Sequence, residues 1–277
     1  MAMSDAPDDD DDDGLPDPGS LLSANLGFLF TDLPFPDRIR AAADAGFRAV
    51  EFHDQAQSAL TQTLVAVEQT GVRVMALNTC HGATMGRAAL EGPLFAEDFR
   101  AALGAAQAVG AEAIHVVAGR AIGPAARATY LRHLDWALAR TDRPLLLEPI
   151  CPAAAPGYHL SRLEDFDAVV AALPHPQMRL LADWFHLGTL YGANGAMARL
   201  ATHPRLGHIQ LARLPDRGDP MPADLPDWPA LLAFARARMI AIGLEYHPGR
   251  PVAEVRAALA AAPGSQTWPS FTASIAT

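Results

Sequence analysis

The sequence predicts one (β/α)8 barrel. Short apolar runs typical of β-strands alternate with longer Ala-, Leu- and Arg-rich helical patterns, and this unit recurs eight times between residues 23 and 261. Gly46, Gly71 and Gly110 lie just beyond the first three helical patterns, where glycine commonly ends a helix. The 277 residues suffice for one barrel of about 250 residues, whereas a doubly wound sheet more often stops at about five or six strands.

The predicted elements alternate strictly along the chain. The strands are Ser23–Phe28, Arg48–His53, Val72–Asn78, Glu112–Val117, Pro144–Glu148, Met178–Asp183, Leu206–Leu211 and Ile240–Tyr246. The helices are Pro36–Ala45, Ser58–Gln69, Ala96–Val109, Pro124–Arg140, Leu163–Leu173, Leu187–Thr202, Trp228–Arg238 and Val252–Ala261. Each helix can therefore return the chain to the start of the next parallel strand.

Residues 1–20 differ in composition from the rest of the chain, with eight aspartates and no basic residue. Such a segment repels itself and has little apolar surface to bury. We therefore expect a disordered acidic tail over residues 1–20, the barrel over residues 21–265 and a C-terminal tail over residues 266–277. The whole chain has a net charge of −10, of which these eight aspartates contribute −8. The remaining residues therefore carry a net charge of −2, so the barrel is nearly neutral.

The composition also excludes several classes of partner. Nucleic-acid binding needs a basic stripe, but the 21 basic residues, all Arg, are scattered along the chain. No apolar run is long enough to span a bilayer, and the first, Leu21–Phe30, follows aspartates instead of a basic segment. Cys80 and Cys151 are too few for a disulfide framework. We expect a cytoplasmic protein that binds neither nucleic acid nor membrane, and the sequence leaves a homo-oligomer open.

Four oxygen-bearing side chains lie at the ends of predicted strands five to eight, namely Glu148, Asp183, Gln210 and Glu245. Neighbouring parallel strands are about 4.8 Å apart, and active sites of such barrels lie at the carboxyl ends of the strands. A single polar strand end is well explained by solvent contact, but three carboxylates at one place repel each other unless a cation lies between them. We therefore predict a divalent-cation site that suits Mg²⁺ or Mn²⁺ and tolerates Co²⁺ or Zn²⁺.

The two glutamates suggest the chemistry of this site. Glu148 and Glu245 would stand across the cation from each other, with a substrate between them. One glutamate could then remove a proton next to a carbonyl, the cation could stabilise the enediolate, and an acid could return a proton to the adjacent carbon. The implied reaction is aldose–ketose isomerisation or epimerisation, because a hydrolytic metal site would more often have additional His ligands.

Four further residues are candidates for substrate contact. His186, just after strand six, could bind a substrate oxygen or simply begin a helix. His208, within strand seven, could orient a ligand or be a hydrogen-bonded core histidine. Glu51, together with His53 at the end of the same strand, could line the pocket floor or belong to a salt-bridged interior. Arg217, in the loop after strand seven, could hold a substrate carboxylate or be a surface charge.

Several segments around these residues resemble the hydroxypyruvate isomerase family, a branch of the xylose isomerase-like barrels that also includes 2-oxo-tetronate isomerases. The matching segments are Ser23–Phe35, Gly46–Phe52, His115–Gly119, Leu147–Ile150, Pro156–Tyr158, Gly207–Gln210 and Glu245–Tyr246. The resemblance implies metal ligation by Glu148, Asp183, Gln210 and Glu245, with the two glutamates as acid and base. It further implies substrate contacts at His186 and Arg217, and Gln210 in place of a His favours small hydroxy-oxo acids over free ketohexoses.

The substrate loops depart from the family pattern. After Glu148 the family continues with Asn and an Arg-containing loop, whereas this chain has Cys151 followed by Pro and three alanines. The loop after strand seven keeps Arg217 but has Asp219 and Asp224 in place of glutamates. The first expectation is a metal-dependent isomerase that converts hydroxypyruvate to tartronate semialdehyde. The alternatives are a 2-oxo-tetronate isomerase, a sugar epimerase, or a non-catalytic metal-binding barrel with a regulatory or partner role.

Overall fold

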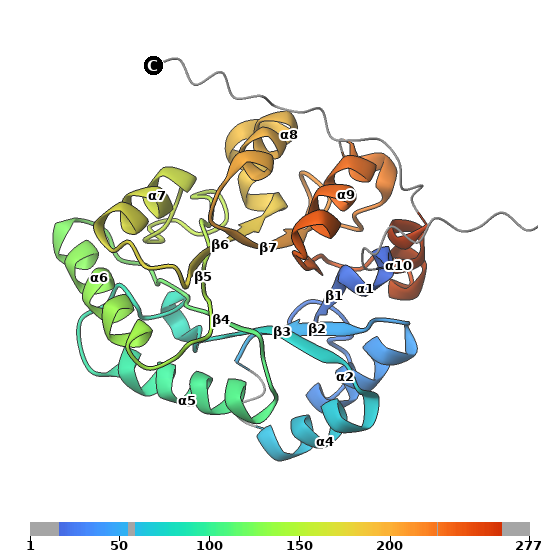
Figure 1. Ribbon diagram of the computed structural model, residues 1–277, viewed down its shortest axis with the longest axis horizontal. Coiled ribbons are helices and arrows are strands. Elements are labelled where there is room, and N and C mark those ends of the chain that lie inside the picture. Colours follow the sequence, from blue (N-terminus) through green and yellow to red (C-terminus); the bar gives the residue numbers. More distant parts are fainter. Residues whose placement is uncertain (1–16, 55–58, 226, 262–277) are drawn as a thin grey trace, which may run out of the picture.

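The computed structural model describes residues 17–54, 59–225 and 227–261. Eight parallel strands form one closed barrel, in which each strand pairs with the next along the chain and the last pairs with the first. Helices surround the barrel as an outer ring (Figure 1). The predicted (β/α)8 barrel is confirmed.

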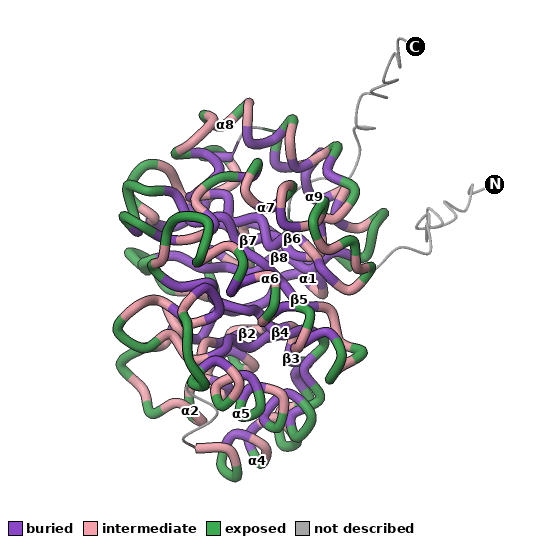
Figure 2. Tube along the Cα trace, turned by 90° about the vertical axis from the view of Figure 1, so that its left-hand side faces the viewer, coloured by how far each residue is buried: buried purple, intermediate pink, exposed green. Residues whose placement is uncertain are grey.

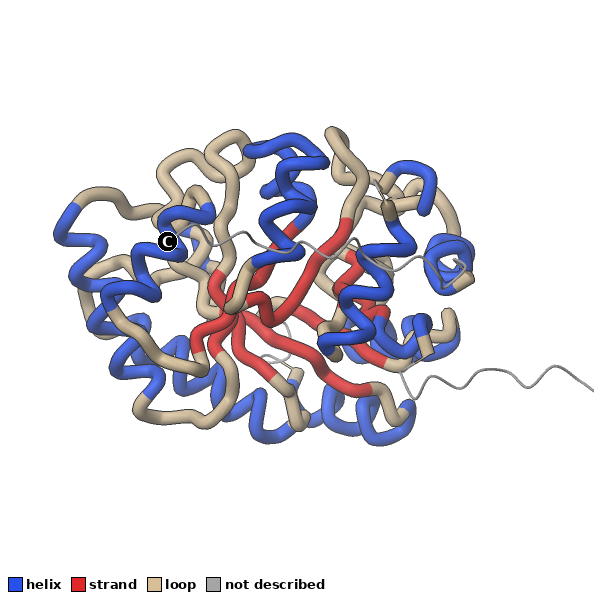
Figure 3. The backbone as a smooth tube through the Cα atoms, turned by 45° about the horizontal axis from the view of Figure 1, so that its top comes forward, coloured by secondary structure: helices blue, strands red, loops and turns tan. Residues whose placement is uncertain are grey.

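The strands are β1 (Leu22–Asn25), β2 (Ala49–Phe52), β3 (Arg73–Asn78), β4 (Ala113–His115), β5 (Leu145–Leu147), β6 (Met178–Asp183), β7 (Leu206–Leu211) and β8 (Ile242–Leu244). The helices are α1 (Pro18–Leu21), α2 (Phe35–Asp44), α4 (Leu60–Thr70), α5 (Leu94–Ala108), α6 (Pro124–Leu138), α7 (Leu163–Ala172), α8 (Trp184–Thr202), α9 (Trp228–Arg238) and α10 (Val252–Ala260). Short 3-10 turns at Gly82–Thr84 and Pro222–Asp224 follow β3 and β7. Figure 3 shows the strands converging inside the helices.

The bounds of β6, β7 and α9 are those predicted. Several other strands are shorter than predicted because their last residues turn into the loops of the barrel mouth. For example, β5 ends one residue before Glu148, and β8 ends one residue before Glu245. The backbone N–H of Glu245 still donates to the carbonyl oxygen of Leu211 at 3.1 Å, so backbone pairing reaches the mouth at this point.

Helix α8 begins three residues earlier than predicted. Asp183 caps it, because its Oδ1 accepts a hydrogen bond from the backbone N–H of Phe185 at 2.7 Å. His186 therefore lies in the first turn of α8 instead of before the helix. Gly192 interrupts the same helix with a left-handed φ of 70°, a conformation that glycine adopts without strain.

Most of the two predicted tails lies outside the described residues. Helix α1 includes the last residues of the segment predicted as an acidic tail. The rest of that segment, and the tail predicted over residues 266–277, lie outside the described residues, and the barrel predicted over residues 21–265 is described through residue 261. Within the described ranges, no helix has both the length and the apolar character needed to cross a bilayer.

The main hydrophobic core lies between the strands and the ring of helices. Its largest fully buried side chains are aromatic and include Phe47, Phe52, Phe95, Phe99, Tyr130, Phe166, Trp184 and Trp228. Burial of one such side chain stabilises a fold by roughly 1.5–3 kcal/mol. Figure 2 shows buried residues along the central strands and exposed residues on the outside of the helices. This packing fixes the strands and thereby the residues at their ends.

The interior of the barrel divides into an apolar half and a polar half. In the apolar half, Ala76, Ala113, Leu146 and Leu181 of β3 to β6 form a small cluster of their own. In the polar half, the buried carboxylate of Glu51 accepts hydrogen bonds from Ser23 (2.9 Å), Asn25 (3.1 Å), His208 (2.6 Å) and Gln210 (2.7 Å). A buried carboxylate is tolerated when its oxygens are bonded in this way.

Glu51 stays ionised despite its burial. Burial alone would raise its pKa, but attraction to His208 and the hydrogen bonds from His208, Gln210 and Ser23 lower the pKa to about 2. Gly243 of β8 leaves room for this carboxylate, because a Cβ atom there would collide with both of its oxygens. The position of the Glu51 carboxylate therefore requires a residue without a side chain at position 243.

We expect Gly243→Ala to lower the free energy of unfolding by roughly 2–4 kcal/mol, because the new methyl group forces Glu51 away from its donors. Urea unfolding followed by circular dichroism measures this change. Gly104→Ala is the matched control. A Cβ at Gly104 meets nothing within 4 Å, so this variant should be neutral or gain about 0.5–1 kcal/mol of helix stability. Equal stabilities of the two variants would contradict the packing argument.

Candidate active site

A cavity of about 370 Å³ opens at the carboxyl ends of the strands. The elements from β5 onward contribute Glu148, His186, Arg217 and Glu245, and the ends of β2 to β4 and the loops after them contribute His53, Asn78, His81 and His115. A larger cavity of about 650 Å³ lies near the amino-terminal ends of β2 and β3, where its charged lining residues are Asp17, Arg48 and Arg256. Of these two cavities, only the smaller is lined by two carboxylates, Glu148 and Glu245, so it is the candidate site.

The four predicted ligands come together because they end consecutive strands. The register pairs Asp183 of β6 with Gln210 of β7, and Gln210 with Gly243 of β8. Glu148 and Glu245 directly follow β5 and β8. All four residues are buried, with exposed fractions of 1–7%. The barrel therefore concentrates these polar groups around one part of its mouth.

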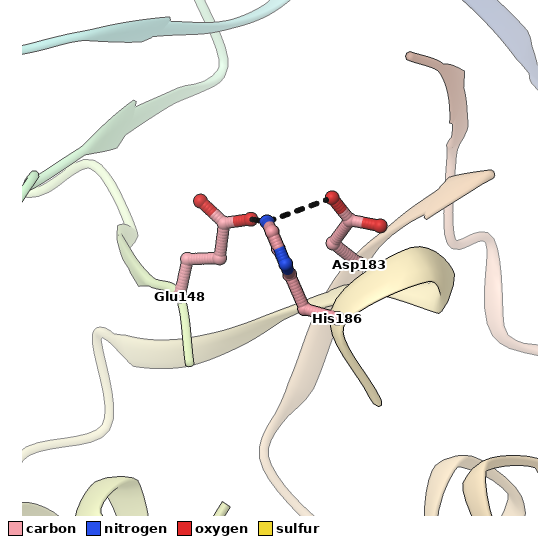
Figure 4. Close-up of side chains that lie close together, drawn as sticks. All are labelled: Glu148, Asp183 and His186. Carbon is pink, nitrogen blue, oxygen red and sulfur yellow. Dashed lines mark ion pairs between the residues drawn. The ribbon is translucent and has the colours of Figure 1, made fainter. Parts of the chain in front are cut away.

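Three side chains have the spacing of a metal site. Glu148, Asp183 and His186 each offer one ligand atom, and these atoms lie within 4.8 Å of one another. His186 Nε2 is 3.7 Å from Glu148 Oε1 and 3.5 Å from Asp183 Oδ2, and Figure 4 shows the imidazole between the two carboxylates. His186, predicted as a substrate contact, thus lies among the predicted ligands because Asp183 caps the helix that bears it.

Gln210 offers an oxygen for the same purpose. Its Nε2 donates a hydrogen bond to Glu51 at 2.7 Å, whereas its Oε1 is buried and has no hydrogen-bond partner in the part of the chain that the structure describes. Buried amide oxygens are normally hydrogen-bonded, and they are also good ligands for hard cations. The unsatisfied oxygen therefore fits the predicted role of Gln210 as a ligand.

Glu245 is held by two donors. Its Oε2 accepts from Asn25 Nδ2 at 2.5 Å, and its Oε1 accepts from Arg217 Nη2. The same Nη2 donates to Asp183 Oδ2 at 2.7 Å. The carboxylate oxygens of Glu245 and Asp183 are therefore no more than two hydrogen-bond lengths apart.

Burial and mutual repulsion disfavour the ionised forms of these carboxyl groups. Burial, followed by repulsion from Asp183 and Glu245, raises the pKa of Glu148 well above its ordinary value. Burial likewise raises the pKa of Glu245 to about 8, although Arg217 acts in the opposite direction. A divalent cation would relieve this repulsion. The carboxylates, the free amide oxygen and the imidazole are a donor set that fits such a cation.

Cys151 orients His186. The Nδ1 atom of His186 is 3.4 Å from Cys151 Sγ, so Nε2 is the nitrogen that faces the carboxylates. Burial lowers the pKa of His186, which keeps the ring neutral near pH 7. Histidines that bind metals usually make a contact of this kind through the second nitrogen. Cys151 supplies it at the position where the family resemblance leads us to expect Asn.

Residues 39–262 match the family model described as a xylose isomerase-like TIM barrel. The chain belongs to this family. The 2-oxo-tetronate isomerase of Cupriavidus necator is 32% identical over 244 residues, which cover 82% of this chain and 92% of that protein. A mouse protein provisionally named hydroxypyruvate isomerase is 31% identical over 251 residues, covering 82% and 89%. The resemblance to the hydroxypyruvate isomerase family is confirmed, and the chain is an isomerase.

Solved structures agree on the fold of this xylose isomerase-like barrel. A family 2 AP endonuclease from Brucella melitensis superposes with a TM-score of 0.72 at 24% identity, over 86% of this chain and 96% of that one. The 3-keto-D-glucoside 4-epimerase of E. coli gives a TM-score of 0.67 at 18% identity, over 86% and 97%. At these identities the likeness supports the barrel architecture alone.

Glu51 and His208, predicted as substrate contacts, lie beneath the mouth in the polar half of the interior. His208 Nε2 is 2.6 Å from Glu51 Oε2, and neither residue is among the described residues that line the candidate cavity. Through Gln210 and Asn25, Glu51 instead orients two side chains at the level of the candidate metal site. The structure thus places both residues in the supporting network behind the site.

Three histidines line the side of the cavity formed by β2 to β4, and of these the sequence singles out only His53, as a candidate for the pocket floor. The rings of His53 and His81 have centroids 4.7 Å apart, and His115 Nε2 is 3.5 Å from Glu148 Oε2. Burial is the main cause that lowers the pKa of His53 and of His115 to about 3, and it also lowers that of His81. These uncharged rings can hydrogen-bond to substrate hydroxyl or carbonyl oxygens.

A sequence rule could have found part of this wall. Asn78 ends both the predicted and the observed β3, so the strand-end criterion that selects Asp183 selects it as well. His115 ends β4, but the predicted strand extends to Val117, so the same criterion does not reach it. Their side chains carry no charge that would mark them in the sequence. His81 lies in a loop, where no regular spacing predicts the direction of its side chain.

We expect His53 to contribute stability that is lost as the pH falls below 6.5. Its pKa is about 3 in the folded chain against 6.5 for the free side chain. Between these values the unfolded chain binds a proton that the folded chain does not, so the stabilisation present above pH 6.5 is lost as the pH falls. One such group contributes at most about 1.4 kcal/mol per pH unit.

Urea unfolding of the wild type and of His53→Gln at several pH values between 7.5 and 4.5 tests this expectation. Relative to the wild type, the variant should become more stable as the pH falls, with a difference in slope of up to about 1.4 kcal/mol per pH unit, which is the contribution of one proton. Parallel slopes in the two proteins would contradict a neutral buried His53.

Proposed function

We propose that this isomerase uses a divalent metal ion to convert hydroxypyruvate to tartronate semialdehyde. The observation that most supports the proposal is the pair of buried glutamates, Glu148 and Glu245, which line one cavity beside a set of cation-binding donors. The names of the relatives support the substrate class, because they include both hydroxypyruvate and 2-oxo-tetronate isomerases.

The reaction moves one hydrogen from carbon 3 to carbon 2. Removal of a proton from C3 of hydroxypyruvate gives an enediolate, and protonation at C2 gives the product. The hydroxyl proton passes from the oxygen on C3 to the oxygen on C2. No oxidant or reductant is consumed, so two carboxyl groups that exchange protons are sufficient for the proton transfers.

The two glutamates differ in how firmly they are held. The nearest histidine nitrogens lie 3.5 and 3.7 Å from the oxygens of Glu148, too far for strong hydrogen bonds, so this carboxyl group is free to take up and release a proton. Asn25 and Arg217 bind Glu245 directly. Without a metal ion both pKa values are raised, that of Glu245 to about 8, and a cation between the carboxylates would lower them. We assign proton transfer to both carboxyl groups. That of Glu148 is held by fewer close hydrogen bonds than that of Glu245.

The metal ion, when bound, supplies Lewis acidity that stabilises negative charge on the substrate oxygens. The residues that would hold it are Glu148, Asp183, Gln210 and Glu245, with His186 as an adjacent donor. This oxygen-rich set suits Mg²⁺ or Mn²⁺ best and tolerates Co²⁺ or Zn²⁺.

The cavity also offers groups for an acid substrate. Arg217 lines it and can pair with a carboxylate through two parallel hydrogen bonds. The neutral His53 and His81 can bond to the remaining oxygens. Ile150 and Ala154 form an apolar part of the wall after β5, where the family pattern predicts a polar loop. A four-carbon 2-oxo acid is the second candidate substrate, because one relative is named 2-oxo-tetronate isomerase.

Proton exchange observed by NMR tests the function directly. Hydroxypyruvate is incubated in deuterated water with Mg²⁺-loaded protein, and a chelator-treated sample is the control. NMR spectra of both samples are recorded over time. Metal-dependent exchange at C3 with formation of tartronate semialdehyde would establish the reaction and its enediolate route. Exchange and turnover with four-carbon 2-oxo acids alone would shift the assignment to the second candidate. Metal binding without turnover of any acid or sugar in the panel would favour a non-catalytic barrel.

We expect Glu148→Gln and Glu245→Gln each to lower kcat by at least about 10²-fold, because each removes a proton-transfer group. Turnover is measured with saturating metal, and circular dichroism checks that the barrel remains folded. Glu112→Gln is the matched control, since Glu112 forms an exposed ion pair with Arg73 away from the cavity. Near-normal turnover in either active-site variant would contradict the acid–base assignment.

Two expectations stay predictions from composition, namely that the protein is cytoplasmic and that it does not bind nucleic acid. Whether it forms a homo-oligomer stays open. Cys80 and Cys151 are both free thiols, as a reducing compartment would leave them.

A further inference from the structure

Arg217 occupies the centre of the carboxylate group. Its side chain is only 11% exposed. Nη2 donates to Asp183 Oδ2 at 2.7 Å and to Glu245 Oε1, and Nη1 is 3.3 Å from His186 Nε2. Attraction to Asp183, Glu245 and Glu148 outweighs the effect of burial and keeps the guanidinium charged.

These contacts use atoms that a metal ion would need. Asp183 Oδ1 is committed to the cap of α8, so Oδ2 is the oxygen left for the site, and Arg217 bonds to it. His186 Nε2, the nitrogen that faces the carboxylates, is also in contact with the guanidinium. A guanidinium and a divalent cation repel each other, so at short range they compete for the same donor atoms.

Two aromatic rings and a backbone hydrogen bond hold Arg217 in place. Its Cζ lies 4.9 Å from the ring centroids of both Phe28 and Phe185, and the backbone N–H of His247 donates to its carbonyl oxygen at 2.8 Å. Its Nε is buried and has no hydrogen-bond partner within the described chain. A buried arginine with a purely structural role normally has all its N–H groups hydrogen-bonded. In Arg217 one of these groups, Nε–H, is left without a partner.

We propose that Arg217 is a displaceable internal counter-ion, which neutralises Asp183 and Glu245 in the metal-free protein and leaves them when a divalent cation binds. The inference rests on the metal site of the proposed function. Its physical basis is that the buried carboxylates need a positive charge at this point, and the guanidinium and the metal ion compete to supply it. The released guanidinium remains at the cavity, where it can meet the carboxylate of an acid substrate. Metal binding would then precede recognition of the acid.

Calorimetric titration with Mn²⁺ alone tests the competition. Arg217→Leu removes the competing charge, so we expect it to bind Mn²⁺ at least about tenfold more tightly than the wild type, and to unfold at a lower temperature when metal-free. Arg217→Lys keeps a charge and should stay closer to the wild-type affinity. Arg213→Leu is the matched control on the same loop, because Arg213 pairs with the exposed Asp216 away from the carboxylates. This control should leave Mn²⁺ affinity within about twofold.

Arginine labelling of the wild-type chain gives a second readout that needs no variant to fold. Phenylglyoxal labelling with peptide mass spectrometry should find Arg217 protected in the metal-free protein and several-fold more reactive with Mn²⁺ bound. The labelling of Arg213 serves as the internal reference. Both results together would support the displacement.

The contrary outcomes separate the two proposals. Equal or weaker Mn²⁺ binding by a folded Arg217→Leu, or unchanged labelling of Arg217 with Mn²⁺ bound, would overturn the counter-ion role and leave the metal site intact. Absence of Mn²⁺ binding in the wild type and in Arg217→Leu alike would overturn the metal site itself, and the counter-ion role with it.

Discussion

The barrel mouth depends on one electrostatic constraint, the cost of gathering three carboxylates in a buried place. Glu148, Asp183 and Glu245 are each at most 7% exposed, and burial and repulsion raise the pKa of both glutamates. Positive charge is needed at this point. The protein supplies it through Arg217, whose guanidinium bonds to two of the three carboxylates. The surrounding histidines do not share this task, because burial keeps His53, His115 and His186 neutral.

A second buried carboxylate supports the first group from below. Glu51 remains ionised because four donors bind it, and two of these donors connect it to the mouth. Gln210 donates its N–H to Glu51 and thereby keeps its oxygen free, and Asn25 bonds to both Glu51 and Glu245. The polar half of the interior therefore orients the site, while the apolar half formed by β3 to β6 provides rigid packing.

Strand periodicity explains why much of the site is predictable. Inward and outward side chains alternate along a strand, and parallel strands end together, so the ends of β5 to β8 identify Glu148, Asp183, Gln210 and Glu245 from the sequence. His186 was placed by a different effect. Asp183 caps α8 with one oxygen, and this local hydrogen bond starts the helix three residues early and turns His186 toward the carboxylates. Hydrophobic periodicity does not locate the first residue of a helix to within a few positions, so it does not predict this helix start.

The barrel, the order of its elements and the four strand-end side chains can be predicted because they follow from repeating patterns within short segments of the chain. The partners of those side chains cannot be predicted in this way, because they come from segments far apart in the sequence. Glu51 meets His208 across 157 positions of chain, and Asn25 meets Glu245 across 220, contacts that exist only once the barrel closes. The loop that carries Arg217 has no periodicity, so its guanidinium is placed by the charges and the aromatic rings of Phe28 and Phe185 that the closed barrel gathers around it.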